Sequence, residues 1–234
     1  MKSFIHNLKD AVDYALEDKV AILVISSLVT IASLINKNAL SDQLFKLFNI
    51  NLLIVVGYGS YVSWYALKGR DEHPSFKNNL RRLIWEGFKK SVIVFIYSAF
   101  LWLVGRQAKL GYMDGSWVIV VLWSILFILL YLCLIGGLLN RYLNKGEFLK
   151  AFNLVEIVKL LLSFDIKSFI KVIFAVVISQ IFSASIVIRF GETFGLIEFI
   201  YSIAVFFLAP FLYIAMKRFI ALNVYELLEK KSEH

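Results

Sequence analysis

The sequence predicts an all-α membrane protein with six transmembrane helices, arranged as three hairpins that each follow an amphipathic helix at the membrane surface. Three observations predict this fold. Of the 234 residues, 60% are hydrophobic and 18% are charged, whereas soluble domains have roughly 45–50% apolar and about 25% charged residues. The apolar residues form six runs, and most basic residues fall in alternate connections between the runs. Because no long polar break separates the runs, we expect one membrane domain over residues 1–234.

The six expected spans follow from the hydrocarbon thickness of a bilayer, which requires ~20 mostly apolar residues per helix. The second, fourth and sixth runs are long enough by themselves. The first and third are short, so flanking lysines such as Lys19 and Lys90 would have to reach the interface by snorkelling. A re-entrant segment is the alternative for these two. The expected spans are residues 20–35, 45–67, 91–105, 117–139, 172–190 and 194–216.

The distribution of lysine and arginine predicts the orientation. With six spans, twenty of the 25 basic residues lie in the N-terminal arm, the second and fourth connections and the tail. The opposite side then carries five, namely Lys37, Lys46, Arg106, Lys109 and Arg189. The positive-inside rule places the basic side in the cytoplasm. We therefore expect a multi-pass protein of the cell membrane with both termini cytoplasmic.

Amphipathic segments precede the first, third and fifth spans. In each segment apolar side chains recur every three or four residues, which gives one apolar stripe on a helix. Basic residues lie between them, as in helices that rest in the headgroup region. The expected surface helices are residues 3–18, 75–90 and 147–164. Their candidate contacts with anionic headgroups are Lys77, Arg81, Arg82, Lys89 and Lys90.

These three segments also suggest an internal repeat. Their leading phenylalanines are Phe4, Phe76 and Phe148, at a constant spacing of 72 residues. We infer three copies of a surface helix followed by two spans. The surface helices either dock on lipid headgroups or a cytoplasmic protein, or only anchor the hairpins.

Polar residues inside the expected spans are candidate functional groups, because a buried polar group in hydrocarbon must find a partner. Gln180 lies near the middle of the fifth span, with Ser179 and Ser183 beside it. Such a cluster would suit a pore or substrate site, and interhelical hydrogen bonding is the alternative. Glu198 in the sixth span is a further candidate. Pro210 is expected to kink that span and to free a carbonyl.

Small residues in the second span point to close packing. Gly57, Gly59 and Ser60 do not form a phosphate loop, because no strand–loop–helix pattern surrounds them. Within a span, small residues more often allow two helices to approach closely.

Two motifs resemble those of a known family. The first runs from Gly69 to Phe76 as Gly-Arg-Asp-Glu-His-Pro-Ser-Phe, and the second from Gly146 to Ile157 contains Gly-Glu-Phe followed by Ala-Phe-Asn-Leu-Val-Glu-Ile. With Pro210 and Tyr213 near the end, they resemble the DUF4013 family of archaeal and some bacterial membrane proteins. His73 replaces the small apolar residue that is usual before the proline. The resemblance implies a membrane protein of uncharacterised function and supplies no catalytic residues.

The function expected from the sequence is a non-catalytic membrane scaffold or accessory subunit. The chain has no HExxH motif, Cys/His cluster or nucleophile elbow, so we expect no enzymatic activity and no cofactor. A small-solute or ion permease with its polar site near Gln180 is the alternative. An enzyme acting on lipid headgroups would have to use Asp71, Glu72 and His73, a loop cluster that is more often solvated charge. The expected partners are the bilayer with its anionic headgroups and a protein partner or second copy of the chain, but not nucleic acid.

Overall fold

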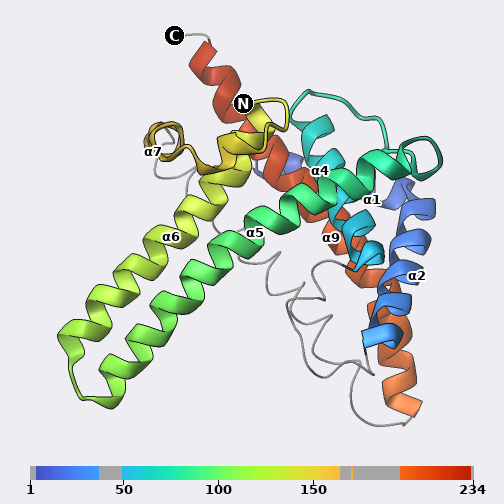
Figure 1. The fold of residues 1–234 in the computed structure, drawn as a ribbon. Coiled ribbons are helices and arrows are strands. Elements are labelled where there is room, and N and C mark those ends of the chain that lie inside the picture. Colours follow the sequence, from blue (N-terminus) through green and yellow to red (C-terminus); the bar gives the residue numbers. More distant parts are fainter. Residues whose placement is uncertain (1–3, 37–48, 164–169, 171–195, 233–234) are drawn as a thin grey trace. The chain divides into compact units, whose positions relative to one another are not determined.

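A computed structural model describes residues 4–36, 49–163, 170 and 196–232, and every element in these ranges is helical (Figure 1). The helices divide into two compact units. Unit 1 comprises Met1–Phe88 and Asp165–His234, and unit 2 comprises Lys89–Phe164. The boundary lies inside one continuous helix, α5 (Phe76–Met113).

In the part of unit 1 that the structure describes there are four further helices: α1 (Phe4–Glu17), α2 (Lys19–Asn36), α4 (Ile50–Ala66) and α9 (Leu196–Ser232). Helix α9 packs against α1, α2 and α4, so the two ends of the chain meet in this unit. Tyr58 and Val62 of α4 and Ile214 of α9 are fully buried in its core. Asn49 caps the start of α4 by accepting a hydrogen bond from the backbone N–H of Asn51 at 2.9 Å.

Unit 2 contains the second part of α5, then α6 (Trp117–Leu143), the 3₁₀ helix η1 (Leu149–Phe152) and α7 (Leu154–Leu162). The end of α6 turns into η1 through Lys145 and Gly146, which both have positive φ. Glycine at such a position has no Cβ to strain. Helices η1 and α7 then pack back against α6.

Three described helices are long and apolar enough to cross a membrane: Asn79–Met113, Trp117–Leu143 and Phe206–Tyr225. They overlap the expected third, fourth and sixth spans, the last of these at residues 206–216. A shorter apolar helix, Lys19–Ile31, falls on the expected first span, and α4 covers most of the second. The expected fifth span, 172–190, lies outside the described residues.

The expected boundaries differ from the observed ones at two places. The expected surface helix 75–90 and the expected span 91–105 are not separate, because α5 runs without a break from Phe76 to Met113. The segment has no proline, and Lys90 has no acceptor atom with which to cap a new helix. The expected surface helix 147–164 is instead split into η1 and α7, because the Asn153 side chain accepts from the Glu156 N–H and starts α7 afresh.

Helix α1 coincides with the first expected surface helix. Its inward side carries Asn7, Ala11, Tyr14 and Ala15, all buried. The apolar stripe expected on this helix continues from Phe4 through Leu8, Val12 and Leu16; Leu8 and Leu16 are exposed and Val12 is half-buried. The stripe therefore faces away from the core of unit 1, as a helix in contact with lipid requires.

Candidate functional site

The most extensive polar cluster in the described part of unit 1 centres on Arg218 of α9, which is 2% exposed. Its guanidinium donates to Asp10 of α1 at 2.6 Å and to Asp71 in the connection between α4 and α5. It also donates to the backbone carbonyl of Arg70 at 3.1 Å. A buried guanidinium requires such partners, because an uncompensated charge away from water is strongly destabilising. Arg218 thereby joins three segments that are far apart in sequence.

Tyr14 of α1 covers this cluster. The guanidinium of Arg218 lies 4.2 Å from the centre of the Tyr14 ring, close enough for a cation–π interaction. The Tyr14 hydroxyl donates to the backbone carbonyl of Glu72 at 3.0 Å. Burial raises the pKa of Tyr14 above its ordinary value and outweighs the opposing effect of Arg218. The hydroxyl therefore keeps its proton and remains a donor at neutral pH.

His73 also lies against the ring of Tyr14. The two ring centres are 4.1 Å apart, and the histidine Nδ1 lies 3.3 Å from a carboxylate oxygen of Asp18. Its Nε2 lies 3.8 Å from Glu17. The connection that carries Asp71, Glu72 and His73 is thus held to α9 at Asp71 and to α1 at the next two residues. The prediction that these side chains are mainly solvated fits Asp71 and Glu72, which are exposed, better than His73, which is half-buried.

Asp18 forms the junction between α1 and α2. One carboxylate oxygen accepts from the backbone N–H of Ala21 at 3.1 Å, as an N-cap does. The other accepts from the hydroxyl of Tyr58 on α4, and the Tyr58 ring stacks on Phe76 at 4.6 Å. Asp18 therefore ends α1, starts α2 and fixes both to α4.

Pro210 frees a backbone carbonyl, as the sequence predicts, and the structure supplies a new donor. Proline has no N–H for the carbonyl of Phe206, four residues earlier in α9. The hydroxyl of Ser26 on α2 lies 2.5 Å from that carbonyl and 2.7 Å from the carbonyl of Ile22. A serine from a neighbouring helix is a common way to satisfy such a carbonyl inside a membrane. Helix α9 continues through Pro210 without interruption.

Glycines allow α4 and the first turns of α5 to cross closely. A Cβ on Gly57 would overlap the backbone carbonyl of Leu83, and a Cβ on Gly87 would overlap the carbonyl of Leu53. Gly59 leaves room for the ring of Tyr213 on α9, whose hydroxyl donates to the carbonyl of Val55 at 3.3 Å. The packing interpretation of Gly57 and Gly59 is therefore confirmed.

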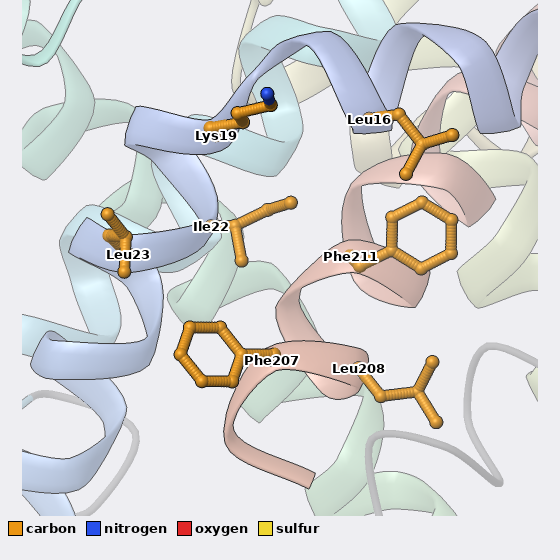
Figure 2. Close-up of a pocket in the computed structure, with 7 residues that line it drawn as sticks. All are labelled: Leu16, Lys19, Ile22, Leu23, Phe207, Leu208 and Phe211. Atoms are coloured by element: carbon orange, nitrogen blue, oxygen red, sulfur yellow. The ribbon is translucent and has the colours of Figure 1, made fainter. Parts of the chain in front are cut away.

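An apolar groove of about 670 Å³ opens between the α1–α2 junction and α9 (Figure 2). Lys19 is the charged residue among the seven that line it. In Figure 2, Lys19 and Leu16 lie at one end, and Phe207 and Leu208 lie at the other. The complete lining is Leu16, Lys19, Ile22, Leu23, Phe207, Leu208 and Phe211.

Unit 2 has its own polar junction, at the end of α6. Asn140 donates to the carbonyl of Lys150 at 2.8 Å and to Glu156 at 3.0 Å, and Lys150 pairs with Glu156 at 2.6 Å. The hydrogen bonds from Lys150 and Asn140 lower the pKa of Glu156, and the bond to Glu156 raises that of Lys150. The Tyr97 hydroxyl donates to the carbonyl of Ala151 at 2.8 Å. Arg141, fully buried, donates to the carbonyl of Gly146 at 3.2 Å.

The structure describes some of the candidate residues chosen from the sequence and not others. Gln180, Ser179 and Ser183 lie outside the described residues, and Glu198 lies in α9 where side chains are not described. Of the expected headgroup contacts, Arg81 and Arg82 are exposed, Lys89 is half-buried, and the side chain of Lys77 is not described. Lys90 differs, because it is buried in unit 2 near the ring of Tyr142.

Sequence reasoning did not single out Arg218, Asp10 or Tyr14. One signal was present: Arg218 lies within an apolar stretch of α9 without a carboxylate nearby in sequence, so its partner had to come from another segment. The identity of that partner depends on the fold. Within the described residues, His, Cys, Asp and Glu side chains form no group of three that could hold a metal ion.

Comparison with known families gives one match. The family model described as "Protein of unknown function (DUF4013)" matches residues 43–191, more than half of the chain. This range includes both motifs noted in the sequence. No curated protein and no solved structure matches the chain.

Proposed function

We propose, from the premise that the chain belongs to the DUF4013 family, that it is a non-catalytic membrane protein acting as a scaffold or an accessory subunit. We place it in the cell membrane with six spans and both termini in the cytoplasm. The family description assigns no activity, so the support comes from the chain's own residues.

The main support is that the candidate catalytic residues of unit 1 make contacts within that unit. Asp71 binds Arg218, the carbonyl of Glu72 accepts from Tyr14, and His73 lies between Tyr14 and Asp18. An enzyme that acts on headgroups would need these three residues to approach its substrate. Here the side chains of Asp71 and His73 and the backbone carbonyl of Glu72 contact α9 and the end of α1, which is a structural task.

A second observation favours an interaction role. The first half of α6 is apolar, and its side chains from Trp117 to Leu129 are mostly exposed in the described structure. An apolar surface of this length needs lipid or another helix to cover it. A scaffold would present such a face to a partner helix or to a second copy of the chain.

Site-specific photo-crosslinking in native membranes tests the proposal. A photoreactive residue at Ile125, on the exposed part of α6, should give a protein adduct of defined mass. The matched control is Leu134 on the same helix, which is buried and should give no intermolecular adduct. Lipid adducts alone at Ile125 and at neighbouring exposed positions would contradict the proposal.

Liposome flux assays separate the scaffold from the permease. The scaffold predicts no flux of small solutes or ions above that of empty liposomes. Flux that disappears in a Gln180→Leu variant would support a permease with its site at Gln180, and would overturn our proposal.

A further inference from the structure

We propose that the groove between α2 and α9 binds one phospholipid, with an acyl chain along the groove and its phosphate paired with Lys19. This site is independent of the scaffold function, because it requires only unit 1. Three observations support it: the lining of the groove, its direction and its fixed walls.

The lining matches hydrocarbon. Six of the seven lining residues are leucine, isoleucine or phenylalanine. Leu23, Phe207 and Leu208 are about half exposed even though they line a concave surface. Burial of this apolar area is favourable, and the volume of about 670 Å³ falls within the usual range of ligand sites.

The direction of the groove matches that of a lipid molecule. Lys19 begins α2 at the point where surface helix α1 ends, which is the level expected for headgroups. Helix α9 has the same polarity, because Lys217 and Arg218 follow Phe211 by six and seven residues, or ~10 Å along the helix axis. Phe207 and Leu208 lie at the opposite end of the groove (Figure 2). The charged end of the groove therefore lies where the phosphate of a bound lipid would lie, and the apolar end lies where its acyl chain would lie.

The walls are fixed relative to each other by bonds outside the groove. Ser26 and the carbonyl of Phe206 join α2 to α9 one turn or less from Ile22, Leu23 and Phe207. At the headgroup end, Asp10 and Arg218 join α1 to α9. Because these bonds hold both walls, the groove has little to reorganise when a lipid enters.

Charge complementarity selects the class of ligand. Lys19 offers a single cation with three N–H donors, which suits a phosphate oxygen of a phospholipid. The oxygens of Asp18, its neighbour, accept from the backbone N–H of Ala21 and the hydroxyl of Tyr58.

Native mass spectrometry of the full-length protein, titrated in mild detergent with phosphatidylglycerol, tests the proposal. We expect one tightly bound lipid per chain, and about tenfold weaker binding of that lipid in a Lys19→Glu variant. The matched control is Lys9→Glu, which makes the same charge change on α1 but outside the groove and should leave binding unchanged. Equal weakening in both variants would contradict a specific site.

A second pair of variants tests the acyl chain. Leu23→Trp fills the groove and should abolish the tightly bound lipid, whereas Ile31→Trp, on the exposed surface of the same helix, should not. Thermal unfolding of each variant without lipid establishes that it is folded. Glycerol phosphate, which has the phosphate but no acyl chain, should not displace the lipid. Unchanged lipid binding in Leu23→Trp, or displacement by glycerol phosphate, would overturn the proposal.

Discussion

The two units are held together by contacts between residues that differ greatly in their separation along the sequence. In unit 1, Arg218 binds Asp10 across 208 residues and Ser26 reaches the carbonyl of Phe206 across 180. In unit 2, Arg141 reaches Gly146 across five residues and Asn140 reaches Glu156 across 16. Unit 1 is therefore complete only when both ends of the chain have met, whereas unit 2 can form from one continuous segment. Local contacts of the second kind generally form faster.

The largest effect is expected when the buried guanidinium of unit 1 loses its counter-charges. The double variant Asp10→Asn with Asp71→Asn leaves Arg218 buried and uncompensated. We expect a loss of about 3–5 kcal/mol in the free energy of unfolding, measured by denaturant unfolding in detergent. A loss below about 1 kcal/mol would mean that the ion pairs between distant segments do not stabilise unit 1.

A smaller effect, of opposite sign in the two units, is expected from glycine substitutions in helices. Gly57→Ala places a Cβ against the backbone of Leu83 and should destabilise unit 1 by about 1–3 kcal/mol. Gly105→Ala in unit 2 meets only a carbon of Phe127 at 3.9 Å, an ordinary contact, and should stabilise by about 0.5–1 kcal/mol. Thermal unfolding compares the two variants, and stabilisation by Gly57→Ala would exclude the close crossing of α4 and α5.

The next prediction isolates the bond between α2 and α9. Ser26→Ala leaves the carbonyl of Phe206 without its donor and should destabilise by about 1 kcal/mol. In a Pro210→Ala background, the new backbone N–H can satisfy that carbonyl, so Ser26→Ala should then have almost no effect. A double-mutant cycle measures this coupling. Equal effects of Ser26→Ala in both backgrounds would show that the serine does not compensate for the proline.

The smallest effect is expected in unit 2, from the Lys150–Glu156 pair. Lys150 lowers the pKa of Glu156 below its ordinary value of 4.5, so the pair contributes stability above that value and loses it as the pH falls through the lowered pKa. Glu156→Gln should remove this pH dependence and change the neutral-pH stability only slightly, because the pair is accessible to solvent. Thermal unfolding of both proteins below about pH 5 provides the measurement. If the stability of the two proteins changes with pH in the same way, the Lys150–Glu156 pair does not contribute the predicted pH dependence.

Sequence reasoning predicted the helices better than their junctions. The apolar runs predicted α2, α6 and most of α4, because helix length and hydrophobicity follow directly from the thickness of a bilayer. The 72-residue repeat predicted a break between a surface helix and a span before each of the first, third and fifth spans. The position 72 residues after Asp18 is Lys90. Asp18 caps a new helix, whereas Lys90 cannot, so α1 and α2 are separate and α5 is continuous.

The candidate site was harder to predict, because its members come from distant segments. Pro210 and its free carbonyl were predicted from the properties of proline alone, but the donor, Ser26, could not be chosen among the many serines of the spans. In the same way, Asp71 and His73 were noticed as a loop cluster, while Arg218, which organises it, lies about 150 residues away. Patterns of local sequence identify groups that need partners, and only the fold supplies the partners.

We infer that the stability of unit 1 depends on the meeting of the two chain ends and that the stability of unit 2 does not. Hydrogen exchange of the protein in lipid nanodiscs, with and without residues 1–17, tests it most directly. Removal of α1 eliminates Asp10 and Tyr14, and we predict lost protection in α4 and in residues 206–225 of α9, with unchanged protection in α6 and α7. Uniform loss across both units, or protection in α9 equal to that of the full-length protein, would contradict the account.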